Sequence, residues 1–352
     1  MYKIIIGNEV LIKVQNYKNE LCDKNIEPGD LLKEKIGNSN INDISVNVLL
    51  EKIIQTKKTQ IYAESEIYGN GSDWNHSELS ILGDVCISVP VTVFNNGEHI
   101  HPKNHSSEFD ATLLYISGTL LRNDNDQIPA DYKEIVVIDH INDESFYQLY
   151  ERRLLPILIY INQLASNKNR KALITIPGLG CGQFAGKFQG ILGEMLKDTL
   201  HNILKKYVMN LPNIQAVYFD PFSECENERF KIEHISYLVR PLLQGNQEKT
   251  QLCLPSDYED TSGEFSKCDL YSLVAWDHVS WPGNDFYIGS RQTDDGVKAA
   301  STDSMYQLTG VIGQYNQHTF CYEPPHPYRN WKAVVDSNNL NLTLKNNLLI
   351  ID

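Results

Sequence analysis

Short runs of apolar, often β-branched residues alternate along the chain with longer stretches in which apolar residues recur every three or four positions. The short runs predict buried strands, and the periodic stretches predict amphipathic helices. The predicted strands cover residues 85–94, 111–117, 135–138, 173–176, 214–219 and 270–275. The predicted helices cover residues 43–56, 144–165, 188–204 and 297–308. Because strands and helices alternate through most of the chain, we expect an α/β sandwich.

A glycine-rich turn follows the predicted strand 173–176. Four glycines fall within the nine residues 178–186, directly before a predicted helix. Glycines at such a turn let the backbone bend tightly and bring bare N–H groups close to a ligand. Those groups, together with the positive end of the helix, bind anions such as phosphate. We therefore predict a phosphate site on the backbone of Gly180–Phe184, the alternative being a tight turn without a ligand.

Two familiar phosphate-binding motifs fit this turn poorly. A Walker A loop would have glycine at Cys181 and a magnesium-binding Ser or Thr at Phe188. Residues 180–185 match the loose dinucleotide pattern G-x-G-x-x-A, but the carboxylate expected about twenty residues further on, at the end of a second strand, is missing. An NAD-dependent oxidoreductase therefore stays open as a less favoured alternative.

A second candidate site lies between the last predicted strand and the last predicted helix. Residues 276–296 contain two Trp, one Phe, one Tyr and four carboxylates. In α/β folds the end of a strand near a helix N-terminus is the usual position of a ligand crevice. Asp294 and Asp295 have an ordinary explanation as helix caps, whereas Asp277 and Asp285 do not. Several carboxylates in an aromatic pocket indicate acid–base chemistry or contacts with ribose hydroxyls.

Composition restricts the class of protein and its partners. A net charge of −14 over 352 residues argues against a nucleic-acid binder and suits a basic protein partner. No apolar run approaches the ~20 residues of a membrane span, and the acidic start does not suit a signal peptide. The seven cysteines include no C-x-x-C pair, which indicates reduced thiols in a cytosol. Two of His99, His101 and His105 could bind a metal, but no carboxylate or cysteine completes the set, so we expect a solvated loop and no metal.

The N-terminal part of the chain carries no recognisable chemistry. We predict that residues 1–75 form an accessory segment and that residues 76–352 form the ligand-binding domain. Residues 2–6 and 10–14 suit the two strands of a hairpin. The glycine-rich stretch 68–76 is either a surface loop or one wall of a nucleoside pocket.

The stretch Pro177–Gly186 resembles the second phosphate-binding loop of macrodomains, which hold the pyrophosphate of ADP-ribose. The order of predicted elements around it is similar to that family, and Phe222 stands where macrodomains often place an aromatic against the nucleoside. Residues 294–300 resemble the start of the helix after the first ligand loop, which ordinary macrodomains place before the pyrophosphate loop. The resemblance therefore implies a macrodomain-like three-layer α/β/α sandwich with a mixed sheet, rearranged or circularly permuted.

Asp277, Asp285 and Asp295, spaced by eight and ten residues, resemble the functional aspartates of macrodomain ADP-ribosylhydrolases among Legionella effectors. Those enzymes remove ADP-ribose from an arginine of ubiquitin. The resemblance extends over about residues 85–311 and implies that Asp285 and Asp295 face the scissile bond, while Asp277 holds a ribose hydroxyl or positions the loop. It implies that these residues bind the ligand: Gly178, Leu179, Gly180, Cys181, Gly182, Gln183, Phe184, Phe222, Trp281 and Asn284.

The resemblance implies no cofactor beyond the ligand ADP-ribose, and an ADP-ribosylated protein, such as ubiquitin, as partner. We expect neither nucleic acid nor membrane as partner, and a cytoplasmic protein that, as an effector, is secreted into the host cytosol. The three-glycine run and paired glutamates of poly(ADP-ribose) glycohydrolases are absent, so that chemistry is not expected. Two further alternatives stay open: a reader that binds ADP-ribose without cleaving it, and a protein-interaction scaffold whose aromatic loop binds a partner.

Overall fold

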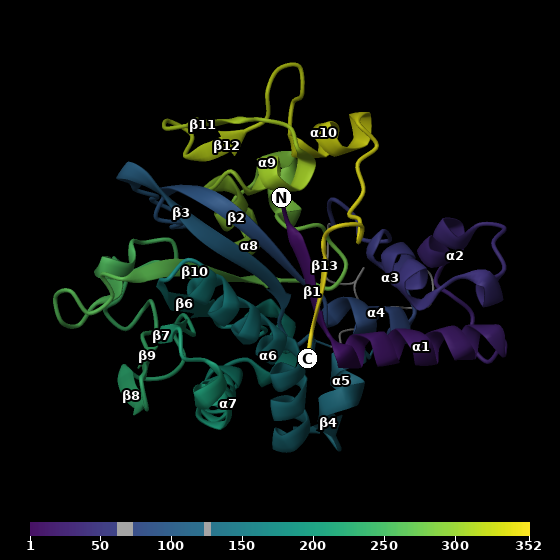
Figure 1. The fold of residues 1–352 in the computed structure, drawn as a ribbon, viewed down its shortest axis with the longest axis horizontal. Coiled ribbons are helices and arrows are strands. Elements are labelled where there is room, and N and C mark those ends of the chain that lie inside the picture. The colour runs from purple at the N-terminus through teal and green to yellow at the C-terminus, as the bar shows by residue number, and fades with distance from the viewer. Residues whose placement is uncertain (62–72, 123–127) are drawn as a thin grey trace.

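A mixed sheet of nine strands forms the centre of the protein in the computed structural model, which describes residues 1–61, 73–122 and 128–352 (Figure 1). In spatial order the strands are β13 (Leu348–Ile351), β1 (Lys3–Gly7), β2 (Cys86–Asn95), β3 (Asn104–Ser117), β10 (Cys268–Trp276), β6 (Lys171–Pro177), β7 (Ile214–Asp220), β9 (Ile235–Val239) and β8 (Glu228–Ile232). β2 is antiparallel to both of its neighbours and β8 is antiparallel to β9, whereas all other neighbouring pairs are parallel.

Helices cover both faces of this sheet. They are α1 (Asn8–Cys22), α2 (Asp30–Ile36), α3 (Val46–Ile54), α4 (His76–Gly83), α5 (Ala130–Ile135), α6 (Asp143–Asn167), α7 (Leu192–Tyr207), α8 (Asp294–Ala300), α9 (Ser304–Thr309) and α10 (Trp331–Ser337). Short 3₁₀ helices are η1 (Ile41–Asp43), η4 (Gln183–Phe188), η5 (Val208–Asn210), η6 (Pro255–Tyr258) and η7 (Asn284–Ile288). Two small hairpins are β4–β5 (Val136–Val137, His140–Ile141) and β11–β12 (Gln314–Asn316, Cys321–Glu323).

The hydrophobic core is divided by the sheet into two layers. Successive side chains of a strand point to opposite faces, so Leu173 packs with residues of α1, α3 and α8–α10, while Ile174 packs with residues of α5–α7. On β3, likewise, Leu113 packs in the first of these layers and Leu114 in the second. The expected three-layer α/β/α sandwich with a mixed sheet is thereby confirmed.

Most predicted elements are present, two are wrong, and the single helix predicted over residues 297–308 is divided into α8 and α9. Five of the six predicted strands correspond to β2, β3, β6, β7 and β10. The stretch 135–138 is not a strand of the large sheet, because α5 extends to Ile135 and only Val136–Val137 pairs, in a separate hairpin. The N-terminal hairpin is also wrong, since residues 10–14 belong to α1.

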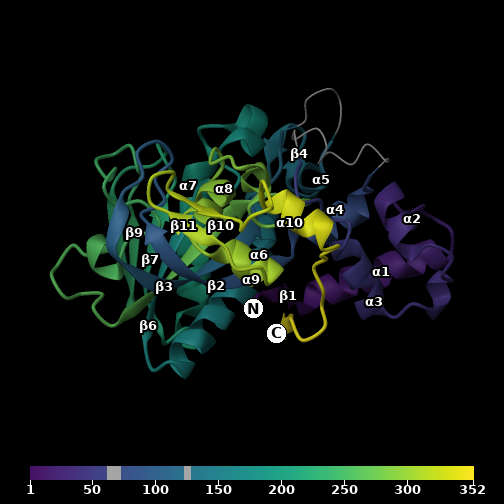
Figure 2. The same cartoon turned by 90° about the horizontal axis from the view of Figure 1, so that it is seen from above.

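Part of the N-terminal region belongs to the large sheet. β1 lies inside the large sheet between β13 and β2, so the first and last described strands are neighbours. Helices α1–α3 extend to one end of the molecule in both views (Figure 1, Figure 2). Of the glycine-rich stretch 68–76, residues 68–72 lie outside the described residues, while Asn75 caps α4 through its side chain.

Candidate functional site

The glycine-rich turn and the acidic segment meet at the carboxyl edge of the central strands. β3, β10, β6 and β7 are parallel neighbours, so the segments that follow them leave the sheet at the same edge. Between these segments lies a cavity of about 580 Å³. It is lined by Ile61, Gly178, Gly180, Gly182, Gln183, Phe184, Ala275, Trp276, Asp277, Asn284, Asp285, Gln292, Thr293, Asp294 and Asp295.

The glycine loop, residues 178–184, forms one wall of the cavity. It is held by a turn in which the Cys181 N–H donates to the Gly178 carbonyl (3.0 Å), and the Ala185 N–H then donates to the Gly182 carbonyl (3.0 Å) to begin η4. The first N–H groups of a helix have no partner within it, so the amides at the start of η4 are available to an anion.

Close backbone packing explains why this loop needs its glycines. Gly180 has φ +78°, and a Cβ there would lie 2.7 Å from the Thr119 nitrogen. A Cβ on Gly118 would lie 2.2 Å from the Gly180 nitrogen. The glycine loop therefore packs directly on the backbone that leaves β3, and the N–H groups of Leu121 and Arg122 both donate to the Phe184 carbonyl at 2.8 Å.

Two predicted ligand-binding residues in this loop do not line the cavity with their side chains. Leu179 and Cys181 are buried in the core behind the loop, because the turn directs them toward α6 and α7. The Leu179 carbonyl accepts a hydrogen bond from Tyr150 Oη (2.6 Å). Burial raises the pKa of the Cys181 thiol well above its ordinary value, so it is a packing residue and not a reactive thiolate.

The acidic segment, residues 277–295, forms the facing wall. Gly283 and Gly289 flank η7, and both have left-handed backbone conformations, with φ of 90° and 88°. Thr293 is the N-cap of α8, and its side chain accepts a hydrogen bond from the Gly296 N–H. This arrangement places Asp285 and Asp295 side by side at the N-terminus of α8.

Asp285 and Asp295 share one hydroxyl group. Thr293 Oγ1 lies 2.7 Å from Asp285 Oδ1 and 2.5 Å from Asp295 Oδ1. A hydroxyl carries a single proton and can donate to only one carboxyl at a time. Both contacts of the Thr293 hydroxyl are hydrogen bonds when Asp295 is protonated and donates to Thr293, which in turn donates to Asp285.

The environment of Asp295 favours this protonated form. Its carboxyl is buried, and burial together with the charge of Asp285 raises its pKa to about 8. Asp285, which is less buried, accepts further hydrogen bonds from the N–H groups of Gln292 (2.7 Å) and Thr293 (3.2 Å). The site therefore contains two neighbouring carboxyl groups whose environments differ, a usual basis for acid and base roles.

Asp277 lines the cavity but uses its oxygens within its own loop. Oδ1 accepts the N–H groups of Val279 and Ser280, both at 2.7 Å, and Oδ2 accepts the Ser280 hydroxyl at 2.5 Å. Its backbone carbonyl accepts the hydroxyl of Ser117 at the end of β3 (2.9 Å). These are the contacts of a residue that fixes the loop.

Asp294, which lines the cavity and is partly exposed, forms an ion pair with the buried Lys298 that the sequence did not indicate. Asp294 Oδ2 accepts the Ala275 N–H (2.8 Å) and lies 3.1 Å from Lys298 Nζ. Burial lowers the pKa of Lys298, which also donates to the Gln251 side chain and the Leu273 carbonyl. A lysine within a predicted helix gives no signal of this role.

Residues 57–61 of the N-terminal region also contribute to the site, which sequence reasoning missed. The Lys58 N–H donates to the Val279 carbonyl (2.8 Å), and the Trp281 N–H donates to the Lys58 carbonyl (2.7 Å). Ile61 lines the cavity and its N–H donates to the Asn284 side chain (2.8 Å). Lys57 lies buried over the Trp276 ring at 3.9 Å.

Two aromatic residues that the resemblance places at the ligand, Trp281 and Phe222, do not line the cavity. Trp281 is buried beside Tyr287, because its backbone pairs with Lys58, and it does not line the cavity. Phe222 is 57% exposed and also lies outside the cavity lining. Asp220 Oδ1 accepts the N–H groups of Phe222 and Leu242, and this bonding fixes the turn that leaves the Phe222 ring in solvent.

Within the described residues, no group of three or more His, Cys, Asp or Glu side chains is arranged to hold a metal ion. His105 instead contacts the Leu252 carbonyl through Nε2 (2.8 Å). Over the same residues, no helix combines the length and the apolar character that a bilayer span requires.

The sandwich, the glycine loop and the facing acidic segment together define a macrodomain. The chain matches the family model described as "Macrodomain effector MavL" over residues 2–328, and it belongs to that family. The match extends beyond residues 85–311 on both sides, so β1 and the 57–61 segment are part of the family's fold. A comparison with curated proteins found no match.

Proposed function

We propose that this protein is a mono-ADP-ribosylhydrolase that removes ADP-ribose from an arginine side chain of a modified protein. Membership of the macrodomain effector family implies interaction with ADP-ribose or with ADP-ribosylated proteins. The observation that supports catalysis is the pair of carboxyl groups Asp285 and Asp295, joined through Thr293, in the wall opposite the glycine loop.

The two walls suit the two halves of the ligand. The diphosphate of ADP-ribose would bind the amides at the start of η4, and the distal ribose would lie toward Asp285 and Asp295. No metal or other cofactor is required by this arrangement.

The chemistry follows from the bond to be broken. Cleavage between ribose C1″ and an arginine nitrogen passes through an oxocarbenium-like state, as glycoside hydrolysis does. The Asp285 carboxylate would stabilise the developing positive charge and orient or deprotonate a water molecule, which is typically worth ~10²–10⁴-fold in rate. Asp295, protonated near neutral pH, would hold Asp285 through Thr293 and act as the acid partner.

The target is proposed from the resemblance to effector ADP-ribosylhydrolases. It would be arginine-linked ADP-ribose on ubiquitin, and the protein would act as a bacterial effector in the host cytosol. A net charge of −14 suits an arginine-bearing, basic partner surface.

The test compares wild type with Asp285→Ala and Asp295→Ala on arginine-ADP-ribosylated ubiquitin. Release of free ADP-ribose should fall by about 10²-fold or more in each variant, while calorimetry should show that ADP-ribose binding persists. Asp336→Ala serves as the control, because this carboxylate lies on α10 and pairs only with the exposed Lys332 among the described contacts.

Wild-type turnover in both variants would refute the assigned roles. ADP-ribose binding by wild type without any release of ADP-ribose would instead identify a reader.

A further inference from the structure

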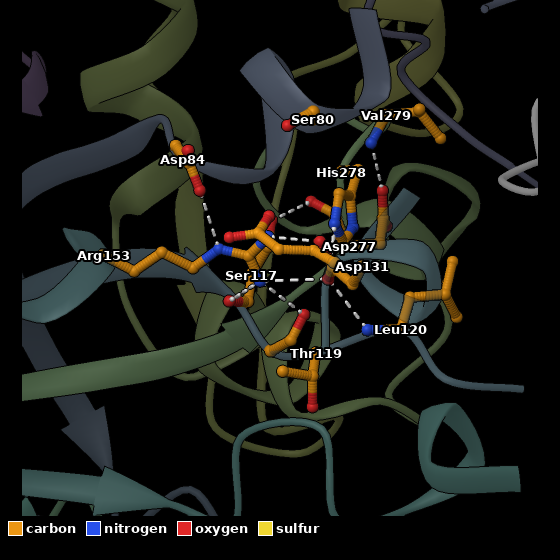
Figure 3. Close-up of polar contacts among 12 residues, drawn as sticks. Ser80, Asp84, Ser117, Thr119, Leu120, Asp131, Arg153, Asp277, His278 and Val279 are labelled. Carbon is orange, nitrogen blue, oxygen red and sulfur yellow. Dashed lines mark hydrogen bonds and ion pairs between the residues drawn. The ribbon is translucent and has the colours of Figure 1, made fainter. Parts of the chain in front are cut away.

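A buried ionic network lies behind the cavity, where the segments after β3 and β10 leave the sheet (Figure 3). Its centre is Arg153 on α6, which is 3% exposed. Arg153 Nε donates to Asp84 Oδ1 (3.0 Å), and its two terminal nitrogens donate to both oxygens of Asp131 (2.7 and 3.1 Å). The guanidinium is thereby held between two carboxylates from α5 and from the end of α4.

Both carboxyl groups are charged. Burial alone would raise the pKa of Asp131, but Arg153 and His278 outweigh it and hold that pKa well below its usual value. The pKa of Asp84 is lowered in the same way, with Lys13, Arg152 and Arg153 outweighing burial. Burying such charges is costly, and well-packed apolar residues can replace a buried ion pair without loss of stability. Stability alone therefore does not explain the network.

Further hydrogen bonds of Arg153 and Asp131 go to the segments that build the cavity. Arg153 Nη1 donates to the carbonyls of Ser117 (3.3 Å) and Gly118 (3.1 Å), where the chain leaves β3. Asp131 Oδ2 accepts the Leu120 N–H (2.9 Å) and contacts His278 Nε2 (3.1 Å). His278 directly follows Asp277 in the acidic segment, and Figure 3 shows its ring directed at Asp131.

These contacts connect the two walls of the cavity. Residues 118–119 pack against Gly180 with no space for a Cβ, so their position sets that of the glycine loop. His278 and the bond from Ser117 Oγ to the Asp277 carbonyl set the position of the acidic segment. Gly83 leaves room for this arrangement, because a Cβ there would lie 2.5 Å from the His278 ring and 2.7 Å from Arg153.

We infer that Arg153, acting with Asp131 and His278, is a positioning residue that fixes the acidic segment relative to the glycine loop. The inference rests on the proposed function. It assigns no contact with substrate to Arg153, which acts through the two backbone segments that it holds. A misplacement of reacting groups by about 1 Å costs on the order of 10²-fold in rate, so loosening this link should affect turnover more than binding.

The adjacent arginine provides a matched control. Arg152 precedes Arg153 on α6 and is partly buried, and it pairs with Asp84 (2.7 Å) and Glu134 (2.8 Å). None of its described contacts reaches the segments at residues 117–120 or 277–280. Arg153→Lys and Arg152→Lys therefore both retain a charge on α6, but only the first removes the forked contacts to the cavity.

The experiment measures kcat and KM for ADP-ribose release, Kd for ADP-ribose by calorimetry, and amide hydrogen exchange. In Arg153→Lys, kcat should fall at least about tenfold while Kd stays within about threefold. Exchange should rise at residues 117–120 and 277–280. Arg152→Lys should keep kcat within about twofold and show no such rise. Asp131→Asn, which retains an acceptor for Leu120, should resemble Arg153→Lys.

Equal kcat in the two lysine variants would overturn the inference, and so would a loss of ADP-ribose affinity (a rise in Kd) as large as the fall in kcat in Arg153→Lys. If wild type releases no ADP-ribose, the proposed function fails, but the exchange comparison still decides whether Arg153 holds the two segments. Unchanged exchange in both segments would then refute the positioning role.

Discussion

Asp295 is buried in the first turn of α8, and the Thr293 hydroxyl links its carboxyl group to that of Asp285. Burial and the charge of Asp285 raise its pKa to about 8, whereas an aspartate in an unfolded chain titrates near 3.9. Folding therefore takes up a proton between these two pH values. The stabilisation from this group is fully present below about pH 4 and is lost as the pH rises through about 8.

This linkage predicts a pH-dependent difference between wild type and Asp295→Asn. From about pH 5 to 8 the free energy of unfolding of wild type should fall by about 1.4 kcal/mol per pH unit relative to the variant, because the amide cannot ionise. Denaturant unfolding at several pH values measures the difference. Parallel stability curves for the two proteins would show that Asp295 titrates normally.

Gly296 is the residue that makes room for Asp285. A Cβ at position 296 would lie 1.6 Å from Asp285 Oδ1, so no side chain fits without moving the carboxylate. In an ordinary helix, Gly→Ala would stabilise by up to about 1 kcal/mol. Here we expect Gly296→Ala to destabilise by about 1–3 kcal/mol and to abolish most ADP-ribose release.

A double-mutant cycle tests this explanation. In the Asp285→Ala background the obstacle is gone, and Gly296→Ala should become neutral or stabilising in thermal unfolding. A cost that is the same in both backgrounds would mean that another contact excludes the methyl group.

At the scale of elements, the N-terminus of α8 combines a helix cap with the link between two carboxyl groups. Thr293→Val keeps the shape of the side chain but removes the hydroxyl, which should cost about 1 kcal/mol as a lost cap and lower ADP-ribose release by at least about tenfold. Thr293→Ser retains the hydroxyl and should stay within about threefold of wild type. Comparing kcat and melting temperature of the two variants separates the hydroxyl's role from the methyl group's. Equal kcat values would exclude the hydroxyl from the reaction.

The sequence predicts the elements whose pattern is local. β6, β7 and β10 are apolar runs because both of their faces are buried, and the glycines at 178–186 indicate their own turn. Asp285 could be proposed because it stands in a carboxylate-rich segment of unusual composition, whereas Asp295 has the local pattern of a helix cap and is implicated only by the resemblance to macrodomain ADP-ribosylhydrolases. The same resemblance implies that Asp285 and Asp295 face the scissile bond.

The features that sequence reasoning missed depend on contacts between distant parts of the chain. Arg153 reads as one polar residue of a periodic helix, and nothing local indicates that it meets Asp84 and Asp131. Trp281 resembled a pocket aromatic, but the pairing of its backbone with Lys58, over two hundred residues earlier, directs it into the core. The local pattern of residues 2–6 predicts a hairpin, because β2 and β13, the true partners of β1, are far away in sequence.

At the scale of the whole molecule, the N-terminal region is integrated with the fold. β1 is an interior strand with a partner on each side, and the side chains of Ile4, Ile5 and Ile6 are fully buried. β13, by contrast, is an edge strand that follows the 2–328 family match. Loss of an interior strand exposes a sheet edge and removes core, whereas loss of an edge strand leaves the rest of the sheet paired.

This contrast predicts opposite outcomes for two truncated proteins. A chain that begins at residue 76 lacks β1, the Lys58 pairing and Ile61, so it should show no cooperative melting and no ADP-ribose binding by calorimetry. A chain that ends at residue 345 lacks only β13 from the sheet, and it should melt cooperatively at a lower temperature while binding ADP-ribose within about threefold of wild type. If residues 76–352 alone bound ADP-ribose with full affinity, residues 1–75 would be the accessory segment that their sequence suggests, and the contribution of Ile61 to the cavity would be dispensable.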